Sequence, residues 1–323
     1  MLALAIVAAC VASLLLSGFY LNLARRWQHL DIPNERSAHS MPTPKGGGVA
    51  IFLALLAACL LAAATLGPWP TIYWQLLLVA AALVTAGVID DRYNLAVALR
   101  LALYALACLA AVSLLYWPAS PWWLGLCTLY ALWLVNLFNF MDGIDGIAAA
   151  EAVFAAGAAA GLSAWQGGDI AYPLFCLLLA AACLGFMYWN WAPARLFMGD
   201  AGSVPIGFLL AALSLLGEAG GSVPLLCWLI LLAVFISDAS VTLVRRALSG
   251  QNITQAHSQH MYQRLARYWG SHGRVVVVMS AVNLAWLLPL AVLALARPEW
   301  GWWALFAAYA PLVIAGVKTG KLP

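Results

Sequence analysis

Charged residues are scarce in this sequence. Asp, Glu, Lys and Arg make up 8% of the 323 residues, and 65% of the residues are hydrophobic. In a typical soluble domain about 25% of residues are charged and about 45–50% are apolar. Apolar runs long enough to cross a hydrocarbon core of roughly 30 Å recur from one end of the chain to the other. The composition therefore excludes a soluble globular protein and predicts a polytopic membrane protein.

Several metal and nucleotide signatures are also absent. The seven cysteines all fall within apolar runs and form no C-x-x-C pair, which argues against a disulfide framework or a zinc site. The glycine-rich segment 37–48 lacks the Gly-Lys-Ser/Thr of a Walker A loop, and segment 136–146 lacks the spacing of an EF-hand. Because repeats and interdomain linkers are missing too, residues 1–323 are interpreted as one domain.

The apolar runs predict an all-α fold of about eleven membrane-spanning helices. The first run has neither the basic start nor the A-x-A end of a signal peptide, so we expect it to be retained as a helix. The predicted spans are 2–23, 47–66, 72–90, 96–117, 121–140, 146–164, 170–190, 203–217, 223–245, 274–296 and 299–317.

The positions of the charges predict an orientation. With the N-terminus outside, every Lys and Arg except Arg297 lies in a cytoplasmic loop or in the C-terminal tail. Because cytoplasmic loops carry an excess of Lys and Arg, the N-terminus is predicted outside and the C-terminus inside. The same side receives all five histidines and most carboxylates, while no long apolar run carries a charge at its middle. We therefore expect the chemistry at one membrane interface, not at the midplane where transporters place ionisable groups.

Five aspartates fall at predicted cytoplasmic helix ends. Carboxylates this close at a low-dielectric boundary repel one another unless some stay protonated or a cation compensates them. Oxygen ligands favour Mg²⁺, with Mn²⁺ as a second candidate. For the segment of Asp142 and Asp145 taken alone, helix capping is the alternative. The five are Asp90 and Asp91, Asp142 and Asp145, which are three apart and expected on one helix face, and Asp200.

Two further polar segments lie on the same predicted side. His257 and His260 precede Arg264 in a loop that has no zinc-partner spacing. That loop either rests against anionic lipid through its arginines or donates hydrogen bonds to phosphate oxygens. In segment 37–48, Lys45 and three glycines open a helix, where backbone amides bind an anion or simply form a turn. Asp238, within the ninth span, is expected to support the site.

Together these segments resemble the polyprenyl-phosphate N-acetylhexosamine-1-phosphate transferases of glycosyltransferase family 4, which are related to the phospho-N-acetylmuramoyl-pentapeptide transferases. The resemblance covers about residues 30–270, and the two predicted helices within 274–317 carry no motif. It rests on PTPKGGG at 42–48, DDR at 90–92 with Arg100, NLFNFMDGIDG at 136–146, NWAPARLFMGDAGS at 190–203 and HSQHMYQRL at 257–265.

The resemblance implies transfer of a sugar-1-phosphate from a UDP-N-acetylhexosamine to undecaprenyl phosphate, with release of UMP and a requirement for Mg²⁺. It places the enzyme in the bacterial cytoplasmic membrane with its site on the cytoplasmic face. It also implies that Asn139 and Asp200 hold the metal and that Phe197 stacks on uracil. The implied catalytic residues are Asp90, Asp91, Asp142, Asp145, His257 and His260, and the implied substrate-binding residues are Lys45, Arg100, Asn136, Phe197 and Arg264.

The resemblance also narrows the mechanism and the donor. The second pKa of a phosphate monoester is about 6, so the lipid phosphate is already mostly dianionic at neutral pH and scarcely needs a base. We expect direct attack with Asp90 or Asp91 as an orienting group, and a covalent aspartyl intermediate is the alternative. Two spaced histidines replace the triple run of the pentapeptide transferases, which favours UDP-GlcNAc or UDP-FucNAc in O-antigen initiation over UDP-MurNAc-pentapeptide.

Two other classes of protein fit the same hydropathy. A membrane transporter of a lipid or a nucleotide sugar is disfavoured because mid-membrane charges and paired broken helices are not expected here. A purely structural membrane scaffold leaves the polar motifs unexplained. The expected partners are the lipid bilayer and the two substrates, without nucleic acid, and a homodimer is compatible with the sequence.

Overall fold

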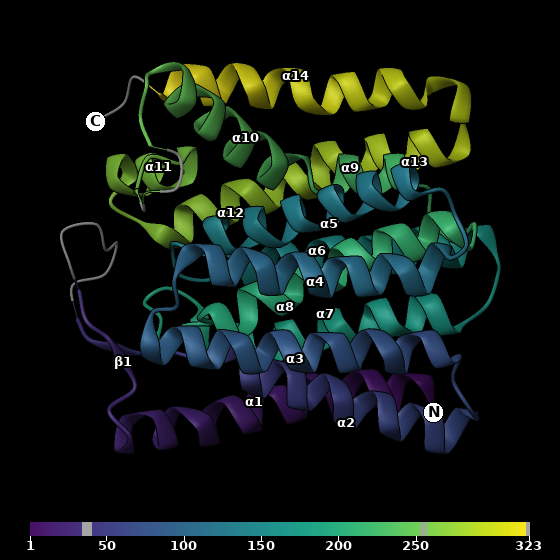
Figure 1. Cartoon of the computed structure of the whole chain (residues 1–323), viewed down its shortest axis with the longest axis horizontal. Coiled ribbons are helices and arrows are strands. Elements are labelled where there is room, and N and C mark those ends of the chain that lie inside the picture. Colours follow the sequence, from purple (N-terminus) through teal and green to yellow (C-terminus); the bar gives the residue numbers. More distant parts are fainter. Residues whose placement is uncertain (34–40, 253–254, 256, 321–323) are drawn as a thin grey trace.

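The computed structural model of the chain describes residues 1–33, 41–252, 255 and 257–320. Arg36, residues 37–40 of the glycine-rich segment and Lys321 lie outside the described residues. Within them the chain is helical apart from a short antiparallel strand pair, β1 (Leu30–Asp31) with β2 (Thr43–Pro44). Long helices lie side by side with their axes along one common direction (Figure 1).

The observed helices follow the predicted apolar runs closely. By length and composition ten helices of the described chain qualify as membrane-crossing, or eleven when one bent pair counts as a span, which confirms the predicted all-α polytopic fold. In order they are α1 (Leu2–Arg26), α2 (Gly48–Leu66), α3 (Thr71–Tyr93), α4 (Val97–Tyr116), α5 (Pro121–Met141), α6 (Ile147–Gln166), α7 (Ala171–Asn190), α8 (Asp200–Ala219), the bent pair α9 (Leu225–Leu231) and α10 (Ala233–Leu248), α12 (His272–Val282) with the π-helix η1 (Asn283–Leu287) and α13 (Leu288–Ala296), and the 3₁₀ turn η2 (Pro298–Trp300) with α14 (Gly301–Thr319).

The core of the molecule surrounds α8. Its spanning window is 89% buried, and α2, α3, α4 and α5 all pack against it. In contrast, the corresponding windows of α1, α4 and α14 are each only 22% buried. Apolar side chains on these outer helices are exposed in the isolated chain because lipid, not protein, is their expected neighbour.

The predicted ninth span, 223–245, is wrong as a single helix. It divides into α9 and α10, which are bent by 72° relative to one another at Leu232. Neither Pro nor Gly occurs between Leu225 and Leu248, so the sequence carries none of the usual kink signals. The bend turns α10 against α5 and α14 and brings Asp238 toward the loop end of the bundle.

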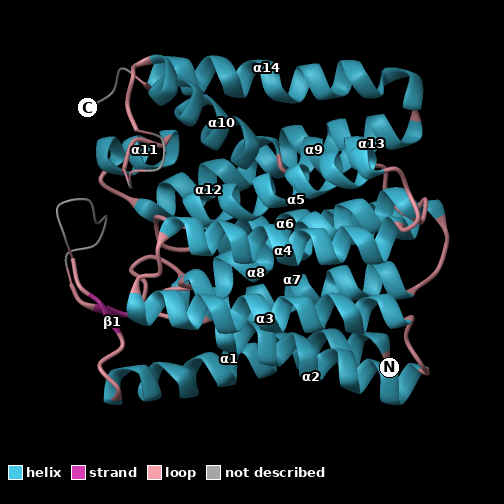
Figure 2. Ribbon diagram, viewed as in Figure 1, coloured by secondary structure: helices cyan, strands magenta, loops and turns pink. Residues whose placement is uncertain are grey.

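The strand pair and the short helix α11 (Met261–Trp269) lie at one end of the bundle, at the left of Figure 2, and we call this end the loop end. The first turn of α1 lies at the opposite end from the last turn of α14 (Figure 1), as an odd number of crossings requires. Which end faces the cytoplasm stays a prediction from the distribution of basic residues.

The close contact between α2 and α8 depends on two glycines, Gly48 and Gly202. A Cβ built on Gly48 would collide with the backbone of Gly202 and Ala201. Gly48→Ala is therefore expected to separate the helices and to cost about 1–3 kcal/mol, the usual range for overpacking. Gly157→Ala on α6 is the matched control because its added Cβ meets nothing within 4 Å. Thermal unfolding of both variants in detergent tests this, and equal melting temperatures would contradict it.

Candidate active site

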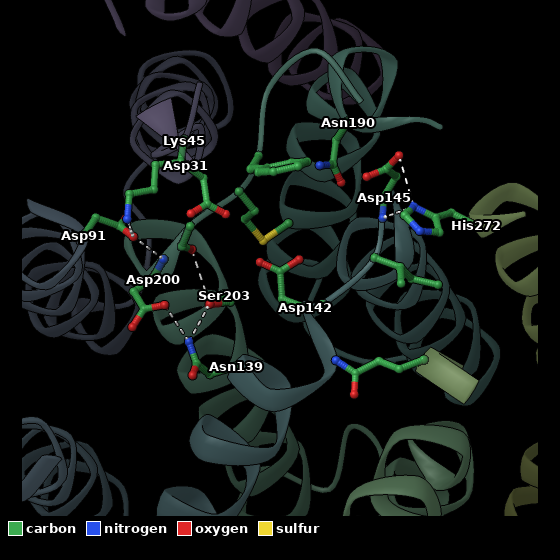
Figure 3. Close-up of a pocket in the computed structure, with 16 residues that line it drawn as sticks. Asp31, Lys45, Asp91, Asn139, Asp142, Asp145, Asn190, Asp200, Ser203 and His272 are labelled. Atoms are coloured by element: carbon green, nitrogen blue, oxygen red, sulfur yellow. Dashed lines mark hydrogen bonds and ion pairs between the residues drawn. The ribbon is translucent and has the colours of Figure 1, made fainter. Parts of the chain in front are cut away.

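A polar cavity of about 320 Å³ opens at the loop end of the bundle (Figure 3). Five carboxylates line it, whereas Lys45 is the one Lys or Arg among its described lining residues. Seven of the predicted site residues meet here: Lys45, Asp91, Asn139, Asp142, Asp145, Phe197 and Asp200. Acidic side chains therefore predominate in this cavity, which we call the donor pocket.

Two amides of the glycine-rich segment are not available to an anion. Gly47 donates to the carbonyl of Phe197 at 2.9 Å and Gly48 donates to that of Met198 at 3.0 Å. In return, the Phe197 N–H donates to the Pro44 carbonyl at 2.8 Å. The segment is therefore a backbone strap that positions Phe197 and the start of α8.

Asp91 caps α8. Its carboxylate accepts hydrogen bonds from the N–H groups of Asp200 at 3.3 Å and Ala201 at 3.2 Å. Gly199 adopts a φ of 71°, and a Cβ there would lie 2.6 Å from Asp91 Oδ2, so only glycine fits this approach. An anion at the N-terminus of a buried helix is stabilised by the helix dipole. Asp91 is therefore a helix cap whose side chain also lines the donor pocket.

Asp90 and Asp91 are neighbours in sequence but have different partners. Asp90 accepts from the N–H of Leu95 at 2.7 Å and from Arg100 Nη1 at 2.9 Å. The same Nη1 lies 3.6 Å from Asp200 Oδ2. Asp200 Oδ1 in turn accepts from Asn139 Nδ2 at 2.9 Å. A continuous chain of charged and polar groups therefore joins α3, α4, α8 and α5.

The prediction that Asp142 and Asp145 share a helix face is wrong. Helix α5 ends at Met141 and α6 begins at Ile147, so both residues lie in the connecting loop. Gly146, at a φ of 79°, stops the helix from running through. Burial raises the pKa of Asp142 well above its usual range, and the carboxylates of Asp200, Asp91 and Asp145 add to the effect.

Asn190 at the end of α7 fixes this loop. Its Oδ1 accepts from the N–H of Gly146 at 3.0 Å, and its Nδ2 donates to the Leu196 carbonyl at 3.0 Å. Asp145 is held similarly, because its Oδ2 accepts from the N–H of Ala194 at 3.1 Å. The two motifs 136–146 and 190–203 are therefore joined by side-chain-to-backbone bonds.

His257 and His260 line a second cavity instead of the donor pocket. This cavity, about 560 Å³ and mostly apolar, runs between α4, α5 and α10, and we call it the apolar groove. Asn139 lines both cavities, so the two meet at its side chain. The residues lining the apolar groove are Val97, Arg100, Leu101, Tyr104, Leu129, Leu132, Trp133, Asn136, Asn139, Phe140, Leu243, Gln255, His257 and His260.

Asp238 organises the histidine loop, in agreement with its expected supporting place. Its carboxylate accepts from the N–H groups of Met261 at 2.7 Å and Tyr262 at 2.9 Å, which caps α11. His260 Nδ1 lies 3.4 Å from Asp238 Oδ1, and the ring of His257 stacks on that of His260 with centroids 4.9 Å apart. Burial, followed by His260 and nearby arginines, lowers the pKa of His257 to about 4. His257 is therefore neutral at physiological pH.

Two predicted substrate-binding residues have other contacts. Arg264 Nε donates to the Gln259 carbonyl at 3.1 Å, and Arg264 is not among the described residues lining either cavity. Asn136 Nδ2 donates to the Leu132 carbonyl at 2.7 Å on its own helix. Their assignment as substrate-binding residues stays a prediction.

Sequence reasoning assigned no role to five polar residues that line the donor pocket: Asp31, Asn190, Ser203, Gln263 and His272. Three of them, Asn190, Ser203 and Gln263, lie within motifs already singled out. His272 is different because it begins α12, in the part of the chain where no motif was recognised. The available signal was a histidine directly after Ser271, a residue that caps helices well.

Comparison of the sequence with known proteins identifies the family of this chain. The pattern of the family described as Glycosyl transferase family 4 matches residues 73–218. The decaprenyl-phosphate N-acetylglucosaminephosphotransferase of Mycobacterium tuberculosis (strain ATCC 25618 / H37Rv) is 32% identical over 320 residues, covering 86% of this chain and 79% of that protein. This chain belongs to glycosyl transferase family 4. The predicted family and the predicted enzyme class, a transferase of sugar phosphates, are thereby confirmed.

Two other members show how far the likeness extends. The probable undecaprenyl-phosphate N-acetylglucosaminyl 1-phosphate transferase of Bacillus subtilis (strain 168) is 26% identical over 321 residues, covering 94% of this family 4 chain and 87% of that protein. The phospho-N-acetylmuramoyl-pentapeptide-transferase of Geobacillus thermodenitrificans (strain NG80-2) is 32% identical over only 152 residues, or 46% of this chain and 44% of that protein. The N-acetylglucosaminyl 1-phosphate transferase therefore matches along more of the chain than the pentapeptide transferase does.

The oxygen atoms that line the donor pocket are suitable ligands for a hard divalent cation. Carboxylate oxygens predominate, and no group of three or more His, Cys, Asp or Glu side chains forms a ready metal cage in the described chain. Mg²⁺ does not require such a cage, because it usually keeps several waters and binds one or two carboxylates together with substrate phosphates. Asn139 presents its amide nitrogen to Asp200 and Ser203, so its carboxamide must turn over before its oxygen can serve as a ligand.

The raised pKa of Asp142 predicts a pH-dependent need for metal. A proton and a cation compete for the same negative charge, and the raised pKa keeps the proton bound to a higher pH. The Mg²⁺ concentration for half-maximal activity is therefore expected to increase as pH falls from 8 to 6, by at most about tenfold per unit for one competing proton. Asp142→Asn is the control and should flatten this dependence. An unchanged slope in that variant would assign the effect to another group.

Proposed function

We propose that this family 4 enzyme transfers N-acetylglucosamine-1-phosphate from UDP-GlcNAc to undecaprenyl phosphate, releasing UMP. The observation that carries the proposal is the meeting of two cavities of opposite character at Asn139. A water-soluble nucleotide sugar suits the polar donor pocket, and a polyprenyl chain suits the apolar groove. Their phosphates then meet where the cavities join.

The donor pocket has groups suited to a uridine diphosphate. Phe197 offers an aromatic face for stacking on a nucleobase. Lys45, whose Nζ lies 3.7 Å from Asp91 Oδ1, is a cation within reach of the cavity. Names of the matched relatives support N-acetylglucosamine as the sugar, since the mycobacterial and Bacillus proteins both carry it in their descriptions.

The apolar groove changes character along its length. Leu101, Leu129 and Trp133 provide an apolar wall suited to isoprene units. Arg100 and the two histidines lie among the lining residues at the polar part, where a lipid phosphate needs hydrogen-bond donors. His257 and His260 are accordingly proposed to contact phosphate oxygens near the junction of the cavities.

The proposed reaction is a direct displacement. An oxygen of the lipid phosphate bonds to the phosphorus that carries the sugar, and the bond from that phosphorus to the bridging oxygen breaks, so UMP leaves with the electron pair. Asp90 orients Arg100, and Arg100 offsets charge at the junction. Asn139 and Asp200 are proposed to hold Mg²⁺, which when bound neutralises diphosphate charge.

The biological setting is proposed from the distribution of charge and from the histidine loop. The loop end of the bundle carries nearly all Lys and Arg residues, so we place the site at the cytoplasmic face of the bacterial membrane. Initiation of a surface glycan such as O-antigen is the proposed role, with UDP-FucNAc as the alternative donor. The short match to the pentapeptide transferase gives UDP-MurNAc-pentapeptide less support.

The reaction is tested by measuring UMP release. Purified protein in detergent with undecaprenyl phosphate and Mg²⁺ is expected to release UMP with UDP-GlcNAc faster than with UDP-FucNAc, UDP-GalNAc or UDP-MurNAc-pentapeptide. Asp200→Asn, which keeps the size of the side chain and removes its charge, should reduce turnover by at least about 10³-fold. Folded wild-type protein that releases no UMP with any donor would refute the enzyme's proposed reaction.

The assignment of the lipid to the apolar groove makes a separate prediction. Leu129→Trp narrows the groove and should raise the KM for undecaprenyl phosphate by about tenfold, equivalent to about 1.4 kcal/mol, while leaving the KM for UDP-GlcNAc unchanged. Leu126→Trp is the control, since Leu126 is similarly exposed on α5 but does not line the groove. Equal effects of the two substitutions on the lipid KM would place the polyprenyl chain elsewhere.

A further inference from the structure

His272 brings a helix without recognised motifs into the wall of the donor pocket. It is the first residue of α12, directly after Ser271, whose hydroxyl accepts from the N–H of Arg274 at 3.2 Å. The His272 side chain is 18% exposed, and its Nδ1 lies 3.2 Å from Asp145 Oδ2 (Figure 3). A rigid helix start thus presents the imidazole to the loop between α5 and α6.

The contacts of His272 define its state. Its Nδ1 also lies 3.5 Å from the backbone N–H of Asp145, a contact that requires Nδ1 to accept. One nitrogen cannot accept there and donate to a carboxylate at the same time. The shorter contact, to a formally charged oxygen, is the stronger one. We therefore assign the proton to Nδ1, which donates to Asp145 Oδ2.

This contact leaves Asp145 fixed but still available to a ligand. Oδ2 accepts from both the Ala194 N–H and His272. The other oxygen points toward the side of the pocket where Asn190 lies (Figure 3). Asn190 does not compete for it, since its amide is already bonded to Gly146 and Leu196. Within the described chain that oxygen accepts no hydrogen bond, so it is free to receive an N–H or O–H of the bound nucleotide.

A second polar contact joins the same two spans deeper in the bundle. Asn283 Nδ2 donates to Glu151 Oε2 at 2.6 Å, and both residues are 0% exposed. Glu151 is on α6, the helix that follows Asp145, and Asn283 opens η1, which continues α12. The pair is only half satisfied, because Glu151 Oε1 and Asn283 Oδ1 have no partner. Buried polar groups left unpaired are costly, so this pair is weak as a stabilising device and better suited to setting register.

Packing between α6 and the span α12–α13 is loose. An apolar hollow of about 610 Å³ separates much of α6 from α12, η1 and α13. Its walls include Val153 and Gly157 on one side and Leu284 and Val292 on the other. Without close interdigitation, sliding of one helix along the other meets little steric resistance. The directional Glu151–Asn283 hydrogen bond is therefore a specific polar contact across an otherwise loosely packed pair of spans.

We propose that His272 is a positioning residue that holds the Asp145 carboxylate for the nucleotide donor, and that Glu151 and Asn283 keep α12 in register for this contact. The inference rests on the proposed function, because it assigns Asp145 to the donor and not to the lipid. It extends the site to the C-terminal spans.

The test uses substitutions that separate the two imidazole nitrogens. The amide nitrogen of Asn occupies the place of Nδ1, whereas that of Gln extends to the place of Nε2. His272→Ala and His272→Gln are expected to raise the KM for UDP-GlcNAc about tenfold, with the KM for undecaprenyl phosphate unchanged. His272→Asn should restore the wild-type value. An unchanged donor KM in His272→Ala, or equal rescue by Gln and Asn, would overturn the proposal.

Asn283 is tested through non-additivity. Asn283→Leu is expected to raise the donor KM in the same direction, and the His272→Ala/Asn283→Leu double variant should be no worse than His272→Ala alone. Additive effects would show that Asn283 acts independently of His272. The His272 series decides the main claim even where Asn283→Leu fails to fold.

Binding of UMP to the detergent-solubilised protein separates this inference from the proposed function. If wild-type protein lacks turnover but binds UMP more tightly than His272→Ala and His272→Gln, the reaction is wrong and the positioning role stands. If wild-type protein turns over UDP-GlcNAc and all three proteins bind UMP equally, the reaction stands and the positioning role is refuted.

Discussion

The start of α8 is the constraint on which the rest of the site depends. A helix that is buried along nearly its whole length presents the partial positive charge of its N-terminus to a low-dielectric interior. Asp91 satisfies the first N–H groups of that helix, and the strap of residues 44–48 closes over it. Gly199 is required because a larger residue would displace the Asp91 carboxylate. These contacts fix the position of Asp200, which lines the donor pocket and contacts Asn139 and Arg100, two residues that line the apolar groove.

The scarcity of charge and its concentration have the same cause. Within hydrocarbon an unpaired ionisable group is costly, so charged residues collect where water, a partner or a ligand can compensate them. The donor pocket gathers five carboxylates around Lys45, an imbalance that a protein would not keep for stability. A cluster of this kind is compensated by protons or by a bound cation.

Sequence reasoning reached the helices and most of the site but not the long-range contacts. Hydropathy located the spans because each depends on its own composition, and the motifs located Asp91, Asn139 and Asp200. The bend at Leu232 was missed because it follows from packing of α10 on its neighbours, with no local Pro or Gly to signal it. The sequence left the strap as either an anion-binding helix start or a turn, because the carbonyls that accept from Gly47 and Gly48 lie about 150 residues away. His272 was missed because its partner, Asp145, belongs to a distant motif.

Backbone contacts divide the aspartates into two groups with different work. Asp90, Asp91, Asp145 and Asp238 each accept at least one backbone N–H and so position a turn, a loop or a helix end. In the part of the chain that the structure describes, neither Asp142 nor Asp200 accepts a hydrogen bond from a backbone N–H of another residue. A carboxylate used to hold the fold is stabilised without a ligand, whereas one without such donors depends on a cation or a proton. The negative charge that would need a cation or a proton is therefore concentrated on Asp142 and Asp200. The other aspartates hold the surrounding backbone in place.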